Sequence, residues 1–248
     1  MKSMLKEAMR HLLPARLKAH RIRGGPLAGC HIYTSWHDYP GAIRGNTEAS
    51  LLEWFARNVK TGETWLDVGA HYGYTAIALS RLTGRNGRVI AFEPVLSTAD
   101  CIERTRKANQ LDQLQIIPLG LSSDSKMVPC QMPVYRGMAD ASRANSGSNQ
   151  SVMTAGFDGL WESLCGGDPV IHGVKIDVQG MEGAVLDGMT AALCRWHPRL
   201  VVEFHAGVDR GAILDLLEDC GYDRDPEPLE VSSKSIEDDK SYAFTPLK

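Results

Sequence analysis

The stretch from Thr64 to Tyr74 constrains the fold of this chain more than any other. It reads as a buried strand, Thr64 to Val68, that runs into a turn containing two glycines and then into a helix. Gly69 and Gly73 let a ligand approach the backbone, and the first turn of the new helix presents unpaired N–H groups. The stretch therefore predicts a ligand-binding turn at the carboxyl end of a strand.

Strands and helices alternate along the rest of the chain, which predicts an α/β fold. Strands are expected at 64–68, 88–92, 114–119, 171–176 and 199–204, with late strands near 222–230 and 241–246. Helices are expected at 47–59, 73–83, 97–109, 181–193 and 209–220. Apolar strands that alternate with helices are typical of a doubly wound, mainly parallel sheet, here with seven strands.

The N-terminal segment is basic. Residues 3–13 have the period of a short amphipathic helix, and Lys2, Lys6 and Arg10 are among the basic residues near it. Such a helix packs on the body as a cap or touches an anionic membrane surface through residues 1–24. We divide the chain into a basic helix and cap segment at 1–46 and a Rossmann-like domain at 47–248.

Composition excludes several classes of protein. The chain is 43% apolar and 23% charged, which is enough to build a full core, and no run approaches the roughly 20 apolar residues that cross a bilayer. The N-terminus lacks the apolar core of a secretory signal, so we expect a soluble cytoplasmic protein. Its six cysteines form no C-x-x-C pair, so we expect reduced thiols and no zinc cluster.

A second strand end identifies the class of cofactor. Glu93 follows the strand 88–92 and is placed to accept hydrogen bonds from both hydroxyls of a ribose. The G-x-G-x-x-G pattern of dinucleotide sites is missing, and Asp67 would repel a pyrophosphate but attract a cationic amino-acid group. These features favour S-adenosylmethionine. An NAD-dependent oxidoreductase and a non-catalytic S-adenosylmethionine-binding protein remain alternatives.

Three stretches of the chain resemble the FkbM-type methyltransferases. They are Leu66 to Gly73, Ala91 to Pro94 and, most particular to this family, Val174 to Gly188. The resemblance covers roughly residues 24 to 248. It implies a class I methyltransferase with a Rossmann-like sheet and an antiparallel last strand. It also implies O-methylation of a hydroxyl on a sugar or a secondary metabolite, with S-adenosylmethionine as donor.

The predicted cofactor site lies around the two turns and the end of the strand 171–176. Its residues are Glu48, Asp67, Gly69, Ala70, His71, Tyr72, Gly73, Glu93, Pro94, Ser122 and Asp177.

Methyl transfer to a hydroxyl needs an aligned acceptor and a group that removes its proton. His205 follows the strand 199–204 and is the first candidate for the general base, since a histidine titrates near neutral pH. Asp177 would orient it or bind the acceptor, and His71 is the alternative base. Asp177, Glu203 and His205 also have the chemistry of a Mg²⁺ or Mn²⁺ ligand set. Sequence alone does not bring them together, so we predict no metal site.

The expected acceptor is a small hydroxylated molecule. Aromatic and histidine side chains between His31 and Tyr39 are candidates for its pocket or for the core. Residues 136–151 are small and polar without an apolar period, which is typical of a substrate-facing lid or binding loop or of a disordered segment. Nucleic acid is disfavoured as a substrate, because the chain carries 30 acidic against 27 basic residues and the basic excess is confined to the N-terminus.

Overall fold

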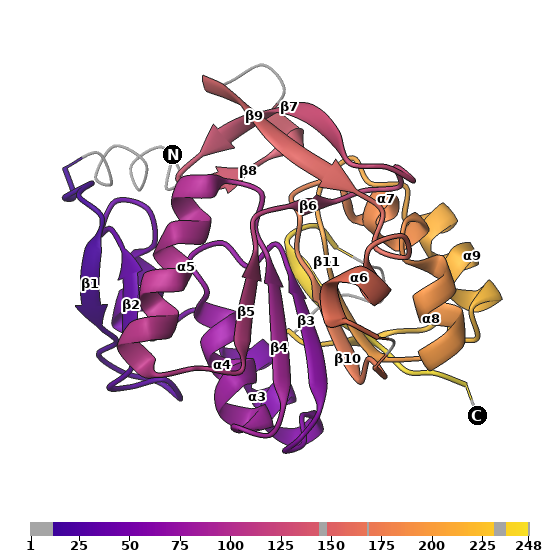
Figure 1. Ribbon diagram of the computed structural model, residues 1–248, viewed down its shortest axis with the longest axis horizontal. Coiled ribbons are helices and arrows are strands. Elements are labelled where there is room, and N and C mark those ends of the chain that lie inside the picture. The colour runs from indigo at the N-terminus through magenta and orange to yellow at the C-terminus, as the bar shows by residue number, and fades with distance from the viewer. Residues whose placement is uncertain (1–11, 144–147, 168, 231–236, 248) are drawn as a thin grey trace.

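A seven-stranded sheet forms the centre of the protein (Figure 1). The computed structural model describes residues 12–143, 148–167, 169–230 and 237–247. The strands lie in the order β12-β13-β11-β10-β3-β4-β5, and the pairs from β11 to β5 are parallel. Their bounds are β3 Thr64–Val68, β4 Arg88–Phe92, β5 Leu114–Ile117, β10 Gly173–Ile176, β11 Arg199–Phe204, β12 Glu227–Pro228 and β13 Lys240–Phe244. The antiparallel β13 and β12 complete the doubly wound sheet that the alternation predicts.

Helices cover both faces of this sheet. One face is packed by α3 Ala49–Asn58 and α4 Tyr74–Thr83, with α5 Leu96–Asn109 beside them, and the other by α7 Glu182–Asp187, α8 Thr190–Trp196 and α9 Arg210–Asp219. Successive side chains of a strand point to opposite faces. Trp65 accordingly joins the core under α3 and α4, whereas Leu66 joins the core under α7 to α9. The short α6, Trp161–Cys165, packs in the second core.

The helix expected over 181–193 is two helices, α7 and α8, in the structure. The break falls at Gly188, where an added Cβ would lie 1.9 Å from the carbonyl oxygen of Ser122. The chain must therefore pass close to the backbone of another segment at this point, and a continuous helix with side chains does not allow that approach.

A second, four-stranded sheet lies across the carboxyl end of the central sheet (Figure 1). Its strands are β6 Gly120–Leu121, β7 Val128–Tyr135, β8 Met138–Ala139 and β9 Ser148–Ala155, and η1 Ala141–Arg143 follows β8. The expectation of an irregular loop over 136–151 is wrong where β8, η1 and the start of β9 lie, and residues 144–147 are outside the described residues. The backbone pairs of β7 with β8 and β9 supply an order that the polar sequence did not reveal.

The described part of the N-terminal segment is a hairpin with a short helix. Strands β1 Lys18–Arg21 and β2 His31–Thr34 pair antiparallel, and α2 Pro40–Arg44 follows. Strand β2 is tied to α5, because the amide N–H of Tyr33 donates to Thr105 Oγ1 at 2.8 Å. The helix predicted over 3–13 lies outside the described residues, apart from its last two positions. The boundary between residues 46 and 47 stays a prediction.

Two cysteines correct the expectation of reduced thiols. Cys194 of α8 and Cys220, at the end of α9, form a disulfide across 26 residues of chain with their Cα atoms 4.5 Å apart. The packing of α8 beside α9 creates this proximity, which no local spacing signals. Among the described helices, none has the length and apolar character needed to cross a membrane.

Candidate active site

A cavity of about 300 Å³ lies at the carboxyl edge of the central sheet. Strands β3, β4, β10 and β11 contribute lining residues at their carboxyl ends. The four-stranded sheet closes it with Met132, Met138 and Thr154, and the N-terminal segment closes it with Asp38 and Tyr39. In parallel sheets the ligand site is found at this edge.

Glu93 is held at one end of the cavity by the backbone. Its Oε1 accepts from the amide of Val95 and its Oε2 from the amide of His71, both at 2.9 Å. The side chain is buried, and this burial raises the pKa of Glu93 to about 8 against the two N–H groups that favour the carboxylate. Each carboxylate oxygen keeps a lone pair for a hydroxyl donor in the cavity.

Lys175 sits under the cavity in a buried ion-pair network. Strand register places it beside Asp67, and its Nζ lies 3.4 Å from Asp67 Oδ1 and 3.4 Å from Asp177 Oδ2. Nζ also donates to the carbonyl oxygen of Gly69 at 3.2 Å. Burial disfavours the charge of Lys175, but Asp177 and Asp67 outweigh it and raise its pKa. Thr75 Oγ1 donates to the other oxygen of Asp67 at 2.7 Å.

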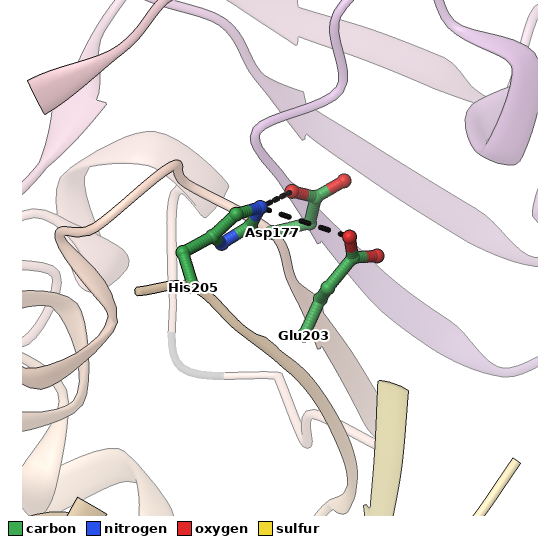
Figure 2. A group of neighbouring side chains, drawn as sticks. All are labelled: Asp177, Glu203 and His205. Carbon is green, nitrogen blue, oxygen red and sulfur yellow. Dashed lines mark ion pairs between the residues drawn. The ribbon is translucent and has the colours of Figure 1, made fainter. Parts of the chain in front are cut away.

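Asp177, Glu203 and His205 converge at the other end of the cavity (Figure 2). Asp177 follows β10, Glu203 is in β11, and His205 follows β11. His205 Nε2 lies 3.7 Å from Asp177 Oδ1 and 3.7 Å from Glu203 Oε1. Behind the imidazole, Nδ1 lies 2.7 Å from Oε1 of the fully buried Glu182. The two carboxylates line the cavity, and the imidazole stands behind them.

These charged groups shift one another's pKa. Asp177 and burial together raise the pKa of Glu203 to about 8. For His205, burial opposes the imidazolium, but Glu182 and Asp177 prevail and raise its pKa to about 9. The pKa of Asp177 is lowered, because Lys175 and His205 outweigh its burial. In the free protein at neutral pH these values leave His205 protonated, which is unfavourable for a general base.

Gln179 contacts the same cluster. Its Nε2 donates to Asp177 Oδ1 at 3.1 Å and lies 2.8 Å from His205 Nε2. With the amide placed in this way, His205 Nε2 accepts and Nδ1 donates to Glu182, which is the neutral imidazole. In the imidazolium form the amide must turn so that its oxygen faces Nε2.

His71, the alternative base, is in the cavity wall. Burial lowers its pKa to about 4, so it is neutral but weakly basic at physiological pH. Its Nε2 lies 3.0 Å from the carbonyl oxygen of Arg136, which can only accept, so Nε2 carries the hydrogen.

Four non-glycine residues of the cavity wall have left-handed backbone conformations: Glu48, His71, Arg136 and Gln179. This conformation costs a residue with a side chain about 1 kcal/mol or more and is enriched at binding sites. Burial of the Glu48 carboxyl raises its pKa, and the negative charge of Asp177 raises it further. The fold thus holds polar side chains in the wall at an energetic cost.

The structure brings most of the predicted cofactor residues to this cavity. Its lining includes Glu48, Gly69, Ala70, His71, Glu93, Pro94 and Asp177. The lining does not include Asp67, Tyr72, Gly73 or Ser122.

Each of these four residues has another partner. Asp67 is fully buried beside Lys175, and the hydroxyl of Tyr72 donates to Asp38 at 3.0 Å. Gly73 begins α4 against Ile102, and Ser122 donates to Asp124 at 2.9 Å. Asp67 therefore acts on the cavity through Lys175 and not by direct contact.

Two further residues of the cavity wall, Lys175 and Arg136, were not among the predicted site residues. Lys175 had a signal, a charged residue between the apolar Val174 and Ile176 of a buried strand. Arg136 had none. Of the aromatic cluster His31 to Tyr39, only Tyr39 lines the cavity, while Trp36 lies under the guanidinium groups of Arg23 and Arg44.

Known proteins resemble this chain in sequence. Residues 67–224 match the model of the methyltransferase FkbM domain. The chain is also 30% identical over 180 residues to the hexuronic acid methyltransferase AglP of Haloferax volcanii, covering 72% of this chain and 70% of that protein.

Solved structures share the fold at low sequence identity. The fibrillarin of Aeropyrum pernix with bound S-adenosyl-L-methionine is 15% identical, with a TM-score of 0.51 over 93% of this chain and 89% of that one. The methyltransferase FkbM of Methylobacillus flagellatus is 16% identical, with a TM-score of 0.49 over 78% of this chain, which spans half the length of that protein.

Proposed function

Because this chain belongs to the FkbM methyltransferase family, we propose that it transfers a methyl group from S-adenosylmethionine to a hydroxyl of a sugar acid. The observation that carries the proposal is one cavity with two chemically different ends. Glu93 follows β4, on one side of β3, and is suited to a nucleoside. Asp177 and Glu203 lie at β10 and β11, on the other side of β3, and are suited to an acceptor.

The residues fit the donor. Glu93 offers both carboxylate oxygens to a ribose diol, and its position is fixed by two backbone amides. Gly69 leaves room where a side chain would strike the backbone of Asp177. The carboxylates of the wall outnumber its cationic side chains Lys175 and Arg136, which suits a ligand bearing an ammonium and a sulfonium. When bound, S-adenosylmethionine supplies the activated methyl group.

At the acceptor end, Asp177 and Glu203 accept hydrogen bonds from the sugar and hold one hydroxyl in line with the methyl carbon. The acceptor oxygen forms its bond to that carbon while the carbon–sulfur bond breaks, and the electron pair of the broken bond goes to sulfur. The hydroxyl proton leaves toward Asp177, the carboxylate of the pair whose pKa is lowered. His205 remains a candidate for the base, and its protonation in the free protein makes a carboxylate the better first acceptor of the proton.

Arg136 supports an anionic acceptor. It lines the cavity, and its Nε and Nη1 are buried without a hydrogen-bond partner in the described structure. A guanidinium pairs bidentately with a carboxylate, so a sugar acid would satisfy these groups after a rotation of the side chain. The name of the Haloferax volcanii relative, a hexuronic acid methyltransferase, supports the same class of acceptor.

The test is product analysis with an isotope-labelled methyl donor and paired acceptors, methyl glucuronoside and methyl glucoside. We expect a methylated glucuronoside that survives mild alkali, as an ether does. A base-labile product would be a methyl ester and would overturn the hydroxyl assignment. The absence of labelled product from any acceptor, with donor binding intact, would favour the non-catalytic alternative.

Arg136→Met should raise KM for the glucuronoside about tenfold or more and leave KM for the glucoside unchanged. Arg104→Met is the matched control, because Arg104 also stacks on a tyrosine but lies on the exposed side of α5. Equal effects of Arg136→Met on both acceptors would contradict the role of Arg136.

A further inference from the structure

We propose that Asp177, Glu203 and His205 bind a divalent metal ion of the Mn²⁺ or Mg²⁺ class at the acceptor end of the cavity. One ligand atom from each of the three side chains lies within 4.8 Å of the others (Figure 2). Carboxylate oxygens with one imidazole nitrogen are ligands for such ions. The binding site stands on geometry alone, and only the role of the ion in catalysis rests on the proposed function.

One oxygen of each carboxylate is held by a protein group outside the cluster, and the other oxygen faces His205. Asp177 Oδ2 contacts Lys175, and Glu203 Oε2 accepts from Ser241 Oγ at 3.3 Å. The other oxygens, Asp177 Oδ1 and Glu203 Oε1, both face His205 Nε2 at 3.7 Å. Adjacent ligands of an octahedral ion are about 3 Å apart, so the two contacts of His205 Nε2 need to shorten by less than about 1 Å.

His205 is prepared as a metal ligand by the group behind it. Its Nδ1 contacts Glu182 Oε1 at 2.7 Å, and Glu182 is fully buried and also accepts from the amide of Gly180. A metal-binding histidine almost always donates its second ring N–H to such a group, which fixes the ring and leaves the other nitrogen as ligand. Glu182 is therefore a positioning residue for the site.

An electropositive group already occupies the gap. The amide nitrogen of Gln179 lies 3.1 Å from Asp177 Oδ1 and 2.8 Å from His205 Nε2, so in the neutral form of the imidazole both atoms act as acceptors toward one point. A cation would replace this amide and make stronger contacts with the same two atoms.

Charge balance favours an ion there. Five buried or half-buried carboxyl groups gather around the cluster: Glu48, Asp67, Asp177, Glu182 and Glu203. Among the described residues that contact them, Lys175 and the imidazolium form of His205 supply positive charge. Like charges in a low-dielectric site repel one another unless a cation compensates them. A divalent ion supplies this compensation and leaves coordination positions open toward the cavity, where two oxygens of a sugar would bind.

The test uses the full chain, stripped of metal with a chelator, and titrates Mn²⁺ alone by electron paramagnetic resonance. We expect one Mn²⁺ per chain and a nitrogen modulation from one imidazole in the pulsed spectrum. His205→Gln should remove that modulation, and His205→Gln, Asp177→Asn and Glu203→Gln should each weaken binding at least tenfold. Glu182→Gln should weaken it roughly 10- to 100-fold.

The control is the pair of exposed acids Asp215 and Glu218 of α9, which contact Arg224 beyond the end of that helix. The double variant Asp215→Asn and Glu218→Gln should bind Mn²⁺ as the unmodified chain does. Far-ultraviolet circular dichroism and thermal unfolding check that every variant is folded. Absence of stoichiometric Mn²⁺ binding, or unchanged binding in folded His205→Gln, would overturn the site. Mn²⁺ binding without methylation of any acceptor would instead count against the proposed function alone.

Discussion

Glu93 combines a buried carboxylate with two backbone donors, so its charge depends on what fills the cavity. Its pKa of about 8 lies above the ordinary value of 4.5, because burial penalises the charged form. A folded pKa above the unfolded one means that the folded state binds the extra proton between about pH 5 and pH 8. The free protein accordingly loses stability as pH rises through this window.

Ligand affinity should change in the opposite direction. A ribose diol donates to the carboxylate, so S-adenosylhomocysteine should bind with release of a proton, and its affinity should rise roughly tenfold from pH 6 to pH 7. Calorimetry in buffers of different ionisation enthalpy measures both quantities. Glu93→Gln cannot titrate and should bind weakly with a flatter pH profile. Identical pH profiles for the variant and the unmodified chain would contradict the assignment of Glu93.

The positive charge of Lys175 compensates the carboxylates of the buried Asp67 and the half-buried Asp177. Lys175→Met leaves Asp67 and Asp177 without their cation and should lower the free energy of unfolding by about 3 to 5 kcal/mol. The exposed pair of Lys107 with Glu103, at 3.1 Å, is the control, and Lys107→Met should cost less than about 1 kcal/mol. Urea unfolding of both variants measures the difference, and equal losses would contradict the network.

At the scale of elements, the turn after β3 depends on two segments lying almost in contact. Gly69 has a φ of +78°, and a Cβ there would lie 1.8 Å from the carbonyl oxygen of Asp177. Gly62 stands before the same strand with a φ of +87° and no atom within 4 Å of such a Cβ. The two glycines share backbone strain and differ in the space around them.

Gly62→Ala should therefore cost about 1 to 2 kcal/mol from backbone conformation alone. Gly69→Ala carries the same cost and a clash between the turns after β3 and β10, worth roughly 1 to 3 kcal/mol more, and should abolish binding of S-adenosylhomocysteine. Denaturant unfolding and calorimetry of the pair test this. A Gly69→Ala variant as stable as Gly62→Ala would show that the turns do not meet so closely.

Element prediction failed where local sequence carries a conflicting signal. Strands 64–68, 88–92 and 199–204 agree with the structure because apolar residues fill them. Strand β7 was missed, since Pro129 and Pro133 are unfavourable in strands, and β9 is polar. Backbone hydrogen bonding between β7 and β9, over the end of the central sheet, stabilises these strands although they contain residues of low strand propensity.

On the scale of the whole molecule, the N-terminal hairpin shares one core with the domain. Ile22, Ile32 and Ile43 are buried in the same cluster as residues of α3 and α4. We therefore expect the chain to unfold in one cooperative transition. Ile32→Ala should lower the stability of that whole transition by about 2 to 5 kcal/mol, whereas Lys18→Ala, on the exposed β1, should leave it unchanged.

Calorimetry with near-ultraviolet circular dichroism checks this expectation. A separate low-temperature transition that alone responds to Ile32→Ala would show that residues 12–46 fold as an independent unit. That result would support a domain boundary near residue 46 in place of a shared core.

The sequence by itself determined the layered sheet and brought forward Gly69 and Glu93, which lie at the proposed cofactor end of the site. Periodicity distinguishes buried strands from helices, and Gly69 and Glu93 act close to where they stand in the chain. Only the tertiary structure decided the acceptor end. Lys175 meets Asp67 through strand register, and His205 meets Asp177, Glu203 and Glu182 through the adjacency of β10 and β11. Sequence patterns record which face a side chain occupies, whereas the distance between two side chains depends on which strands become neighbours.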